Sequence, residues 1–318
     1  MSIVPSLRCA PMARVDYNEF GYFHENAEEY GIPYPSAPTV RRESIAMSDH
    51  RAMSALMWGD SSPRLVFLHG GAQNAHTWDT VMLALGVPAI CIDLPGHGHS
   101  GAVNPLAASG DPLEGNAHDM AIVIEQLAPD AEAVIGMSLG GMTTIALSHH
   151  HPHLVKKMVL VDITPGIDGD KTKAITAFVN GPATFDSFDD LLQRTIQFNP
   201  TRSESSLRRG ILHNALQQPD GTWVWRYRRT DAPPLQEVEG QIRKPNLDML
   251  WDAISAFQKP LMLVRGMRPQ SVVSDDDEAE IRRRAPHARI ERVLEAGHSV
   301  QGDAPLELAA LIRDFALA

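Results

Sequence analysis

The chain has 318 residues, enough for one large domain or two small ones, and its 43% hydrophobic content is ample for a buried core. A formal net charge of −11 at pH 7 would repel a phosphate backbone or an anionic lipid surface, so nucleic acid is not an expected partner. No stretch approaches the roughly 18 apolar residues of a membrane span, so we expect no membrane association. Residues 1–14 lack the apolar core of a secretory signal, and two cysteines make no disulfide framework. We therefore expect a cytoplasmic location.

Residues 1–38 read as an irregular N-terminal arm whose interleaved aromatic side chains pack onto the domain that follows. Two β-patterned runs, 41–47 and 53–58, flank the turn signal Ser48-Asp49-His50, which predicts a hairpin. From residue 64 onward, short apolar runs rich in β-branched residues alternate with stretches of helical spacing. The predicted strands are 64–68, 89–92, 133–136 and 158–161, and the predicted helices are 76–85, 115–127 and the segment after Ser138.

The strand and helix alternation stops at residue 166 and resumes at residue 260. The intervening segment contains four helix-like stretches, proline breaks and a strand-like patch at Trp223-Val224-Trp225, so it reads as an inserted, mainly helical cap. Outside it, continuous apolar strands alternating with helices predict a doubly wound α/β fold with a mostly parallel sheet. The expected units are the arm (1–38), the core (39–165 and 259–318) and the cap (166–258).

A serine turn lies at the centre of this pattern. The run Val134-Ile135 ends at Gly136, Ser138 follows, and Gly140-Gly141 open a helix-like segment. In a strand, sharp turn and helix of this kind, a nucleophile elbow, the serine hydroxyl stands over the sheet edge. The N–H of the residue after it, Leu139, would lie at a helix N-terminus, where an oxyanion is favoured. A serine in a glycine-rich turn is common, so other motifs must decide its role.

Three more motifs occur in order around this turn: His69-Gly70-Gly71, Asp93-Leu94-Pro95-Gly96-His97-Gly98 and Gly297-His298. Together with Gly136-Met137-Ser138-Leu139-Gly140-Gly141 they resemble the α/β-hydrolase family, in its cap-bearing serine hydrolase branch, over roughly residues 40–318. The resemblance implies the α/β-hydrolase fold and a Ser-His-Asp catalytic triad with Ser138 as nucleophile and His298 as base. It also implies an oxyanion hole formed by the N–H groups of Gly71 and Leu139.

The triad acid departs from the commonest pattern of that family. After the predicted strand 261–264, no carboxylate appears before Asp275, and residues 275–278 look like a helix start, where acids suit the macrodipole. Some α/β hydrolases carry the acid after the strand that follows the nucleophile helix, and Asp162 occupies that position. We favour Asp162, with Asp275 as the alternative acid, and a purely structural role for Asp162 in the strand-to-cap turn stays open.

Other histidines have structural interpretations. His69 follows a strand directly, at a position that supports the oxyanion loop in the family, and His97 belongs to a turn. The histidines at 149–151 and 153 gather at a helix C-terminus. Because the sequence shows no acidic or thiol partner beside them, we expect no metal site there.

The expected reaction is two-step acyl transfer to water, cleaving an ester, lactone or thioester of a small to medium hydrophobic substrate. A serine nucleophile argues against the dehalogenase and epoxide hydrolase chemistries of the family, which use aspartate. No dinucleotide fingerprint, P-loop or metal quartet occurs, so no cofactor and no metal are expected. The alternatives are a C–C bond hydrolase on the same triad, a non-catalytic ligand-binding protein, and a cofactor-free oxygenase or perhydrolase; the oligomeric state stays open. Six aromatic residues of the cap line a pocket or form its own core, and we favour the core for most of them: Phe178, Phe185, Phe188, Trp223, Trp225 and Trp251.

Overall fold

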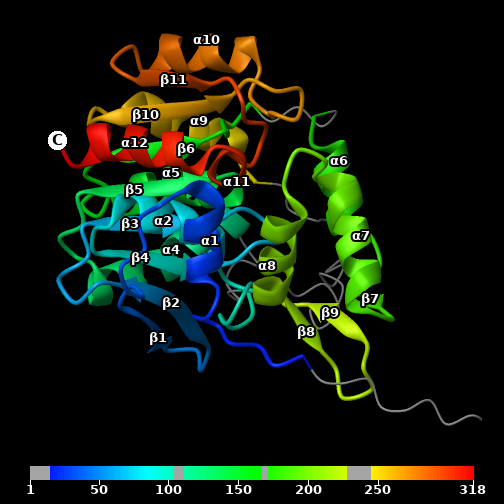
Figure 1. The fold of residues 1–318 in the computed structure, drawn as a ribbon. Helices are drawn as coiled ribbons and strands as arrows, with labels where there is room; N and C mark the ends of the chain where they lie inside the picture. The colour runs from blue at the N-terminus through cyan, green and yellow to red at the C-terminus, as the bar shows by residue number, and fades with distance from the viewer. Residues whose placement is uncertain (1–14, 104–110, 167–170, 228–244) are drawn as a thin grey trace, which may run out of the picture.

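An eight-stranded sheet forms the centre of the protein, seen in a computed structural model that describes residues 15–103, 111–166, 171–227 and 245–318. Its strands are β1 (Val40–Ala46), β2 (Ala52–Trp58), β3 (Leu65–Leu68), β4 (Ala89–Asp93), β5 (Ala133–Met137), β6 (Met158–Val161), β10 (Leu261–Gly266) and β11 (Arg289–Val293). Their order across the sheet is β1-β2-β4-β3-β5-β6-β10-β11 (Figure 1). The first two pairings are antiparallel and the other five are parallel. The predicted doubly wound, mostly parallel sheet and the N-terminal hairpin are confirmed.

Helices cover both faces of the sheet. They are α1 (Phe23–Tyr30), the 3-10 helix η1 (Ala75–Trp78), α2 (Asp79–Leu85), α4 (Pro112–Leu127), α5 (Leu139–His150), α9 (Leu247–Ala256), α10 (Asp275–Arg284), α11 (Val300–Asp303) and α12 (Pro305–Ala316). Buried side chains of α4, α5, α9 and α10 share one core cluster, and those of α1, α2, α11 and α12 share the other. In β3, Val66 and Leu68 join the first cluster and Leu65 and Phe67 the second, as the two-residue period of a strand requires. None of the helices in the described ranges combines the length and apolarity needed to cross a membrane.

The structure corrects the expectation of an irregular arm over residues 1–38. Residues Phe23–Tyr30 form α1, which ends at Gly31 in the left-handed conformation with φ 64°. Phe23 and Ala27, about one turn apart, are buried, and the ring centroid of Phe23 lies 5.0 Å from that of Trp58. The helix is hard to read from sequence because Tyr22 provides no side-chain cap and neighbouring aromatic residues obscure the helical period. Residues 1–14 of the arm lie outside the described ranges.

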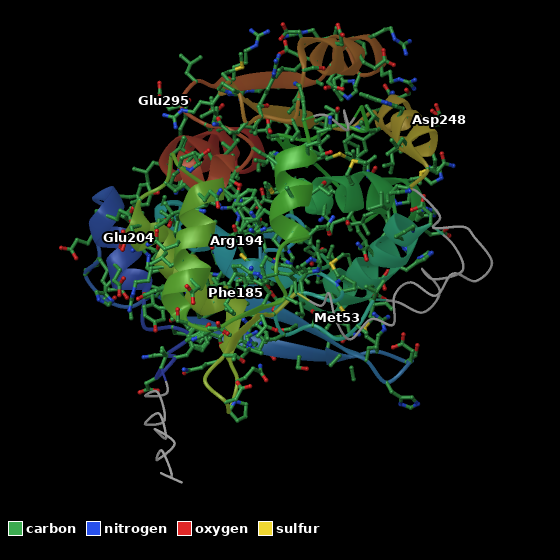
Figure 2. The ribbon with its side chains drawn as sticks, turned by 90° about the vertical axis from the view of Figure 1, so that its right-hand side faces the viewer. Met53, Phe185, Arg194, Glu204, Asp248 and Glu295 are labelled. Atoms are coloured by element: carbon green, nitrogen blue, oxygen red, sulfur yellow. The ribbon has the colours of Figure 1, made fainter. Side chains whose placement is uncertain are left out.

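The segment predicted as an inserted cap forms a separate group of elements beside the main sheet. These are α6 (Lys173–Val179), β7 (Thr184–Phe185), α7 (Phe188–Phe198), α8 (Glu204–Asn214), β8 (Ala215–Gln217) and β9 (Trp223–Trp225). The three strands form a small antiparallel sheet in the order β7-β9-β8. Figure 1 places the group to the right of the main sheet, and Figure 2 views the molecule from that side, with Phe185 and Arg194 in front.

Most of the aromatic residues of this segment form its own core, as expected. Phe185 and Trp223 are buried with the apolar side chains of α7 and α8, and Phe188 and Trp225 pack against them. Trp251 differs, because α9 packs on the main core cluster together with α5 and α10. The last of the six, Phe178, lines a cavity described below.

Helix α8 is tied to the N-terminal segment by polar contacts. The Arg209 side chain is only 3% exposed; its Nε donates to Asn26 Oδ1 at 3.0 Å, and its guanidinium forms an ion pair with Glu29. The Tyr17 hydroxyl lies 2.8 Å from His213 Nδ1. Helix α6, by contrast, contains no buried residue.

Candidate active site

Ser138 occupies a strained turn between β5 and α5. Its backbone angles are φ 50° and ψ −117°, a region that residues other than glycine rarely adopt. Strand and helix approach so closely here that larger residues would not fit. A Cβ atom on Gly136 would lie 2.4 Å from the carbonyl oxygen of Gly140, and one on Gly140 would lie 2.2 Å from that of Leu68. The glycines beside Ser138 therefore have a steric reason to be glycine.

Asp162 and His298 come together although 136 positions separate them in the sequence. Asp162 follows β6 and His298 lies in the loop after β11, so both leave the carboxyl ends of parallel strands at one edge of the sheet. His298 Nδ1 lies 3.0 Å from Asp162 Oδ2, and this contact orients the other ring nitrogen of His298, Nε2, away from the carboxylate.

The Asp162 carboxylate is fully buried and accepts three hydrogen bonds besides the His298 contact. The backbone N–H of Gly266 donates to Oδ1 at 2.9 Å, Ser271 Oγ donates to Oδ1 at 2.6 Å, and the N–H of Val272 donates to Oδ2 at 3.0 Å. The last residue of β10 and the loop after it, which lacks an early carboxylate, thus supply donors to a carboxylate that directly follows the neighbouring strand β6. Sequence reasoning missed Ser271, because a single serine in a loop carries no recognisable spacing.

Asp275 lies in a different environment. It is the first residue of α10, its side chain is 92% exposed, and Arg265 Nη1 lies 2.7 Å from its Oδ1. Ser274 caps the same helix, and Asp277 completes a capping box with it. The acidic run at 275–278 is therefore a helix start, and the structure pairs His298 with Asp162 and not with Asp275.

A cavity of about 970 Å³ lies between the main sheet and the inserted segment. Ser138, Leu139, Gly71 and His298 all line it, so the cavity brings together the predicted nucleophile, base and oxyanion donors. The side of the cavity that the inserted segment forms is lined largely by apolar residues: Ala174, Ile175, Phe178, Val179, Phe198 and Pro200.

Two histidines hold the loop that carries Gly71. The N–H of Leu94 donates to His69 Nε2 at 2.9 Å, which leaves His69 Nδ1 to donate to the carbonyl oxygen of Gly70 at 2.7 Å. Burial lowers the pKa of His69 to about 3, so this ring is neutral. His97 Nε2 accepts from the N–H of Ala72 at 3.1 Å. Both side chains act as hydrogen-bonding supports of the loop, which agrees with their structural interpretation.

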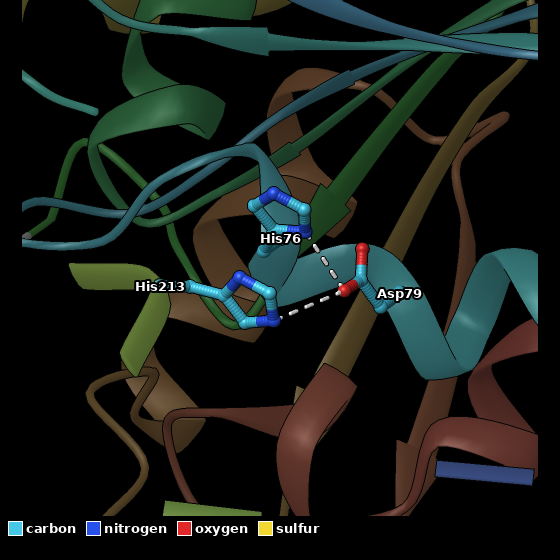
Figure 3. A group of neighbouring side chains, drawn as sticks. All are labelled: His76, Asp79 and His213. Atoms are coloured by element: carbon cyan, nitrogen blue, oxygen red, sulfur yellow. Dashed lines mark hydrogen bonds and ion pairs between the residues drawn. The ribbon is translucent and has the colours of Figure 1, made fainter. Parts of the chain in front are cut away.

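A second, smaller cavity of about 150 Å³ is bordered by a buried group comprising His76, Asp79 and His213 (Figure 3). Asp79 Oδ2 lies 2.9 Å from His76 Nδ1 and 3.8 Å from His213 Nε2. The two imidazole rings stack with centroids 3.8 Å apart and planes within 11°. Lone pairs of parallel rings do not converge on one point, so this group is a poor metal site in spite of its composition. Glu19 adds a second carboxylate, 3.1 Å from His76 Nε2.

This buried group predicts a pH dependence of stability. Burial alone would lower the pKa of His76, but the carboxylates of Asp79 and Glu19 outweigh it and raise the pKa to about 9. Since the unfolded value is about 6.5, the contribution is complete below pH 6.5 and is lost as pH rises through 9. We expect the wild type to lose about 3 kcal/mol of unfolding free energy over that range relative to His76→Asn/Asp79→Asn, which removes both titrating groups. Denaturant unfolding at several pH values measures the difference, and parallel curves for the two proteins would contradict it.

Comparisons with known proteins agree on one family. Residues 65–311 match the model of the alpha/beta hydrolase family. The esterase Rv0045c of Mycobacterium tuberculosis is 43% identical over 309 residues, which cover 93% of this chain and 95% of that protein. The sn-1-specific diacylglycerol lipase ABHD11 of Danio rerio is 26% identical, covering 81% of this chain and 79% of the lipase. The crystal structure of the Mycobacterium tuberculosis esterase superimposes with a TM-score of 0.77 at 41% identity, covering 94% of this chain and 98% of that one.

Proposed function

We propose that this chain, which belongs to the alpha/beta hydrolase family, is a serine hydrolase that cleaves carboxylic esters with Ser138, His298 and Asp162 as its catalytic triad. The observation that carries the proposal is the contact of His298 Nδ1 with the buried Asp162 carboxylate, beside a cavity that Ser138 and His298 both line. The similar esterase of Mycobacterium tuberculosis supports the choice of an ester.

The proposed mechanism proceeds in two acyl-transfer steps. Ser138 Oγ attacks the ester carbonyl while His298 Nε2 accepts its proton, and Asp162 stabilises the imidazolium through Nδ1–H. The N–H groups of Gly71 and Leu139 receive the oxyanion; the first N–H groups of a helix, here α5, have no partner within it and favour negative charge. His298 then protonates the departing alcohol. Water, activated by the same imidazole, releases the acid from Ser138.

The cavity supports a hydrophobic substrate of small to medium size. Its volume of about 970 Å³ exceeds what a short acyl chain fills, and α6 contributes the apolar side chains of Ile175, Phe178 and Val179 to its wall. Lactones, thioesters and β-diketones would use the same catalytic groups. A panel of these substrates beside aryl esters of increasing chain length ranks them by kcat/KM.

The proposal is tested by the intact mass of the protein after treatment with an activated phosphonate ester. We expect one adduct on the wild type and none on Ser138→Ala, because only an activated serine reacts rapidly with such reagents. An unlabelled wild type would contradict the serine hydrolase proposal and would favour a non-catalytic ligand-binding role. Labelling of both proteins would place the reactive group elsewhere in the chain.

Ser271 should act on catalysis through Asp162. Removing its hydroxyl in Ser271→Ala deletes a 2.6 Å hydrogen bond to a buried carboxylate, and bonds to charged groups contribute about 1.5–3 kcal/mol. We expect kcat to fall about 10-fold or more with little change in KM, because the hydroxyl positions the acid without touching substrate. Ser274→Ala is the matched control: it removes the cap of α10 and should lower stability but not kcat. Equal effects of both exchanges on kcat would argue against this role.

A further inference from the structure

A group of metal-binding side chain types lies on the surface where α4 packs against the C-terminal end of α5, apart from the proposed catalytic groups. Glu114 and His118 are four residues apart on one face of α4, and His150 is the last residue of α5. One ligand atom from each of the three lies within 4.8 Å of the others. The expectation that no acidic partner accompanies these histidines is therefore wrong, because the partner comes from another helix.

The separation of Glu114 and His118 suits a shared ion better than a direct bond. His118 Nε2 lies 3.6 Å from Glu114 Oε1, too far for a good hydrogen bond. Two ligand atoms on a tetrahedral zinc ion, each about 2.0–2.1 Å from the metal, are about 3.3 Å apart. A shift of a few tenths of an ångström would bring both onto one ion.

The other ring nitrogen of His118 has a hydrogen-bonding partner, His151. His118 Nδ1 lies 2.8 Å from His151 Nε2, and the two rings stand at 89° to one another. With a proton on Nδ1 donated to His151, the lone pair of His118 lies on Nε2 and faces Glu114. Such an outer hydrogen bond fixes the tautomer and the direction of a metal ligand.

His150 and its surroundings complete the site. Its Nε2 has no hydrogen-bond partner among the described residues, an unfavourable state for a buried nitrogen atom. The C-terminal end of α5 carries partial negative charge, which favours a cation. The side chains of Glu114 and His118 are 46% and 43% exposed, so an ion in solution has direct access.

We propose that Glu114, His118 and His150 bind one divalent transition-metal ion of the zinc type, with His151 orienting His118. Imidazole and carboxylate donors with water in the remaining position suit zinc and also accept cobalt, nickel or copper. His150 is twelve positions from Ser138, about 18 Å along α5, so the bound metal would lie away from the catalytic groups.

Zinc binding to the full chain without an affinity tag tests the proposal by titration calorimetry and by the shift of the melting temperature. We expect one zinc ion per chain at this site and a higher melting temperature with zinc. His118→Ala should remove both effects, and His151→Ala should weaken binding roughly 10- to 100-fold. His287→Ala is the matched control, because His287 is exposed and contacts the carbonyl oxygen of Lys259, and this variant should bind zinc like the wild type.

Three results would overturn the proposal. The first is a wild type that binds no zinc at concentrations up to about 1 mM. The second is a His118→Ala protein that binds zinc as tightly as the wild type. The third is binding that is abolished by His298→Ala or His213→Ala but not by His118→Ala, which would place the ion at the proposed catalytic groups or in the buried His76 group.

Discussion

Exchanging Ser138 for alanine is expected to lower kcat for a short-chain aryl ester by about 10⁴-fold or more, because no acyl intermediate then forms and only the oxyanion donors and substrate binding still act. Steady-state hydrolysis by purified protein measures the loss. A variant that kept a tenth of wild-type turnover would contradict the role proposed for this serine.

Ser138→Gly provides the matched control, because it removes the hydroxyl and also the backbone strain. At φ 50° and ψ −117°, alanine keeps the strain of the wild type whereas glycine is relieved of it. Strained residues of this kind cost roughly 1–3 kcal/mol. Both variants should be inactive, and the glycine variant should be the more stable by about 1 kcal/mol or more in denaturant unfolding. Equal stability of the two would show that the turn holds no such strain.

Exchanging Asp162 for asparagine should lower kcat/KM by about 10⁴-fold, since an amide cannot hold His298 in the productive tautomer or stabilise its positive charge. Asp275→Asn should leave kcat/KM within about twofold, because its exposed side chain contacts Arg265 and not His298. The same ester assay measures both.

The Asp162 comparison needs a stability measurement beside it. The Asp162 carboxylate accepts from Gly266, Ser271 and Val272, so an amide NH₂ in its place would face donors and destabilise the fold. Activity is therefore compared at a temperature where melting curves show both variants folded. A large loss in Asp275→Asn with normal activity in Asp162→Asn would reverse the assignment of the acid.

The sequence predicted most of the core because the sheet strands are short apolar runs between helices, and their parallel pairing follows from that alternation. Helix α1 was missed because its start at Tyr22 has no side-chain cap. Local spacing identified Ser138 and His298 through their glycine-rich turns. Local spacing did not decide between Asp162 and Asp275 as the acid of the triad, because the approach of Asp162 to His298 depends on the order of β6, β10 and β11 in the sheet.

The roles of Ser271 and of the Glu114, His118 and His150 group could not be predicted from the sequence either, because they too depend on contacts between distant elements. Ser271 follows β10 and contacts Asp162 at the end of the neighbouring strand β6, and nothing in the local sequence marks that contact. Glu114 and His118 have readable helical spacing, but the packing of α4 on α5 brings them to His150. Contacts between elements distant in sequence are set by tertiary packing, which a single sequence does not display.

The polar contacts between α8 and the N-terminal segment bear on which part of the inserted segment can move away from the main sheet at the lowest cost in free energy. Rotation of that segment as one rigid lid would separate Arg209 from Asn26 and Glu29 and would leave a guanidinium that is only 3% exposed without its partners. None of the residues of α6 is buried, and Arg194 holds the helix by donating hydrogen bonds to the carbonyl oxygens of Ala177 and Phe178. Since residues of α6 line the cavity beside Ser138, we expect a local opening at α6 to cost less free energy than rotation of the whole inserted segment.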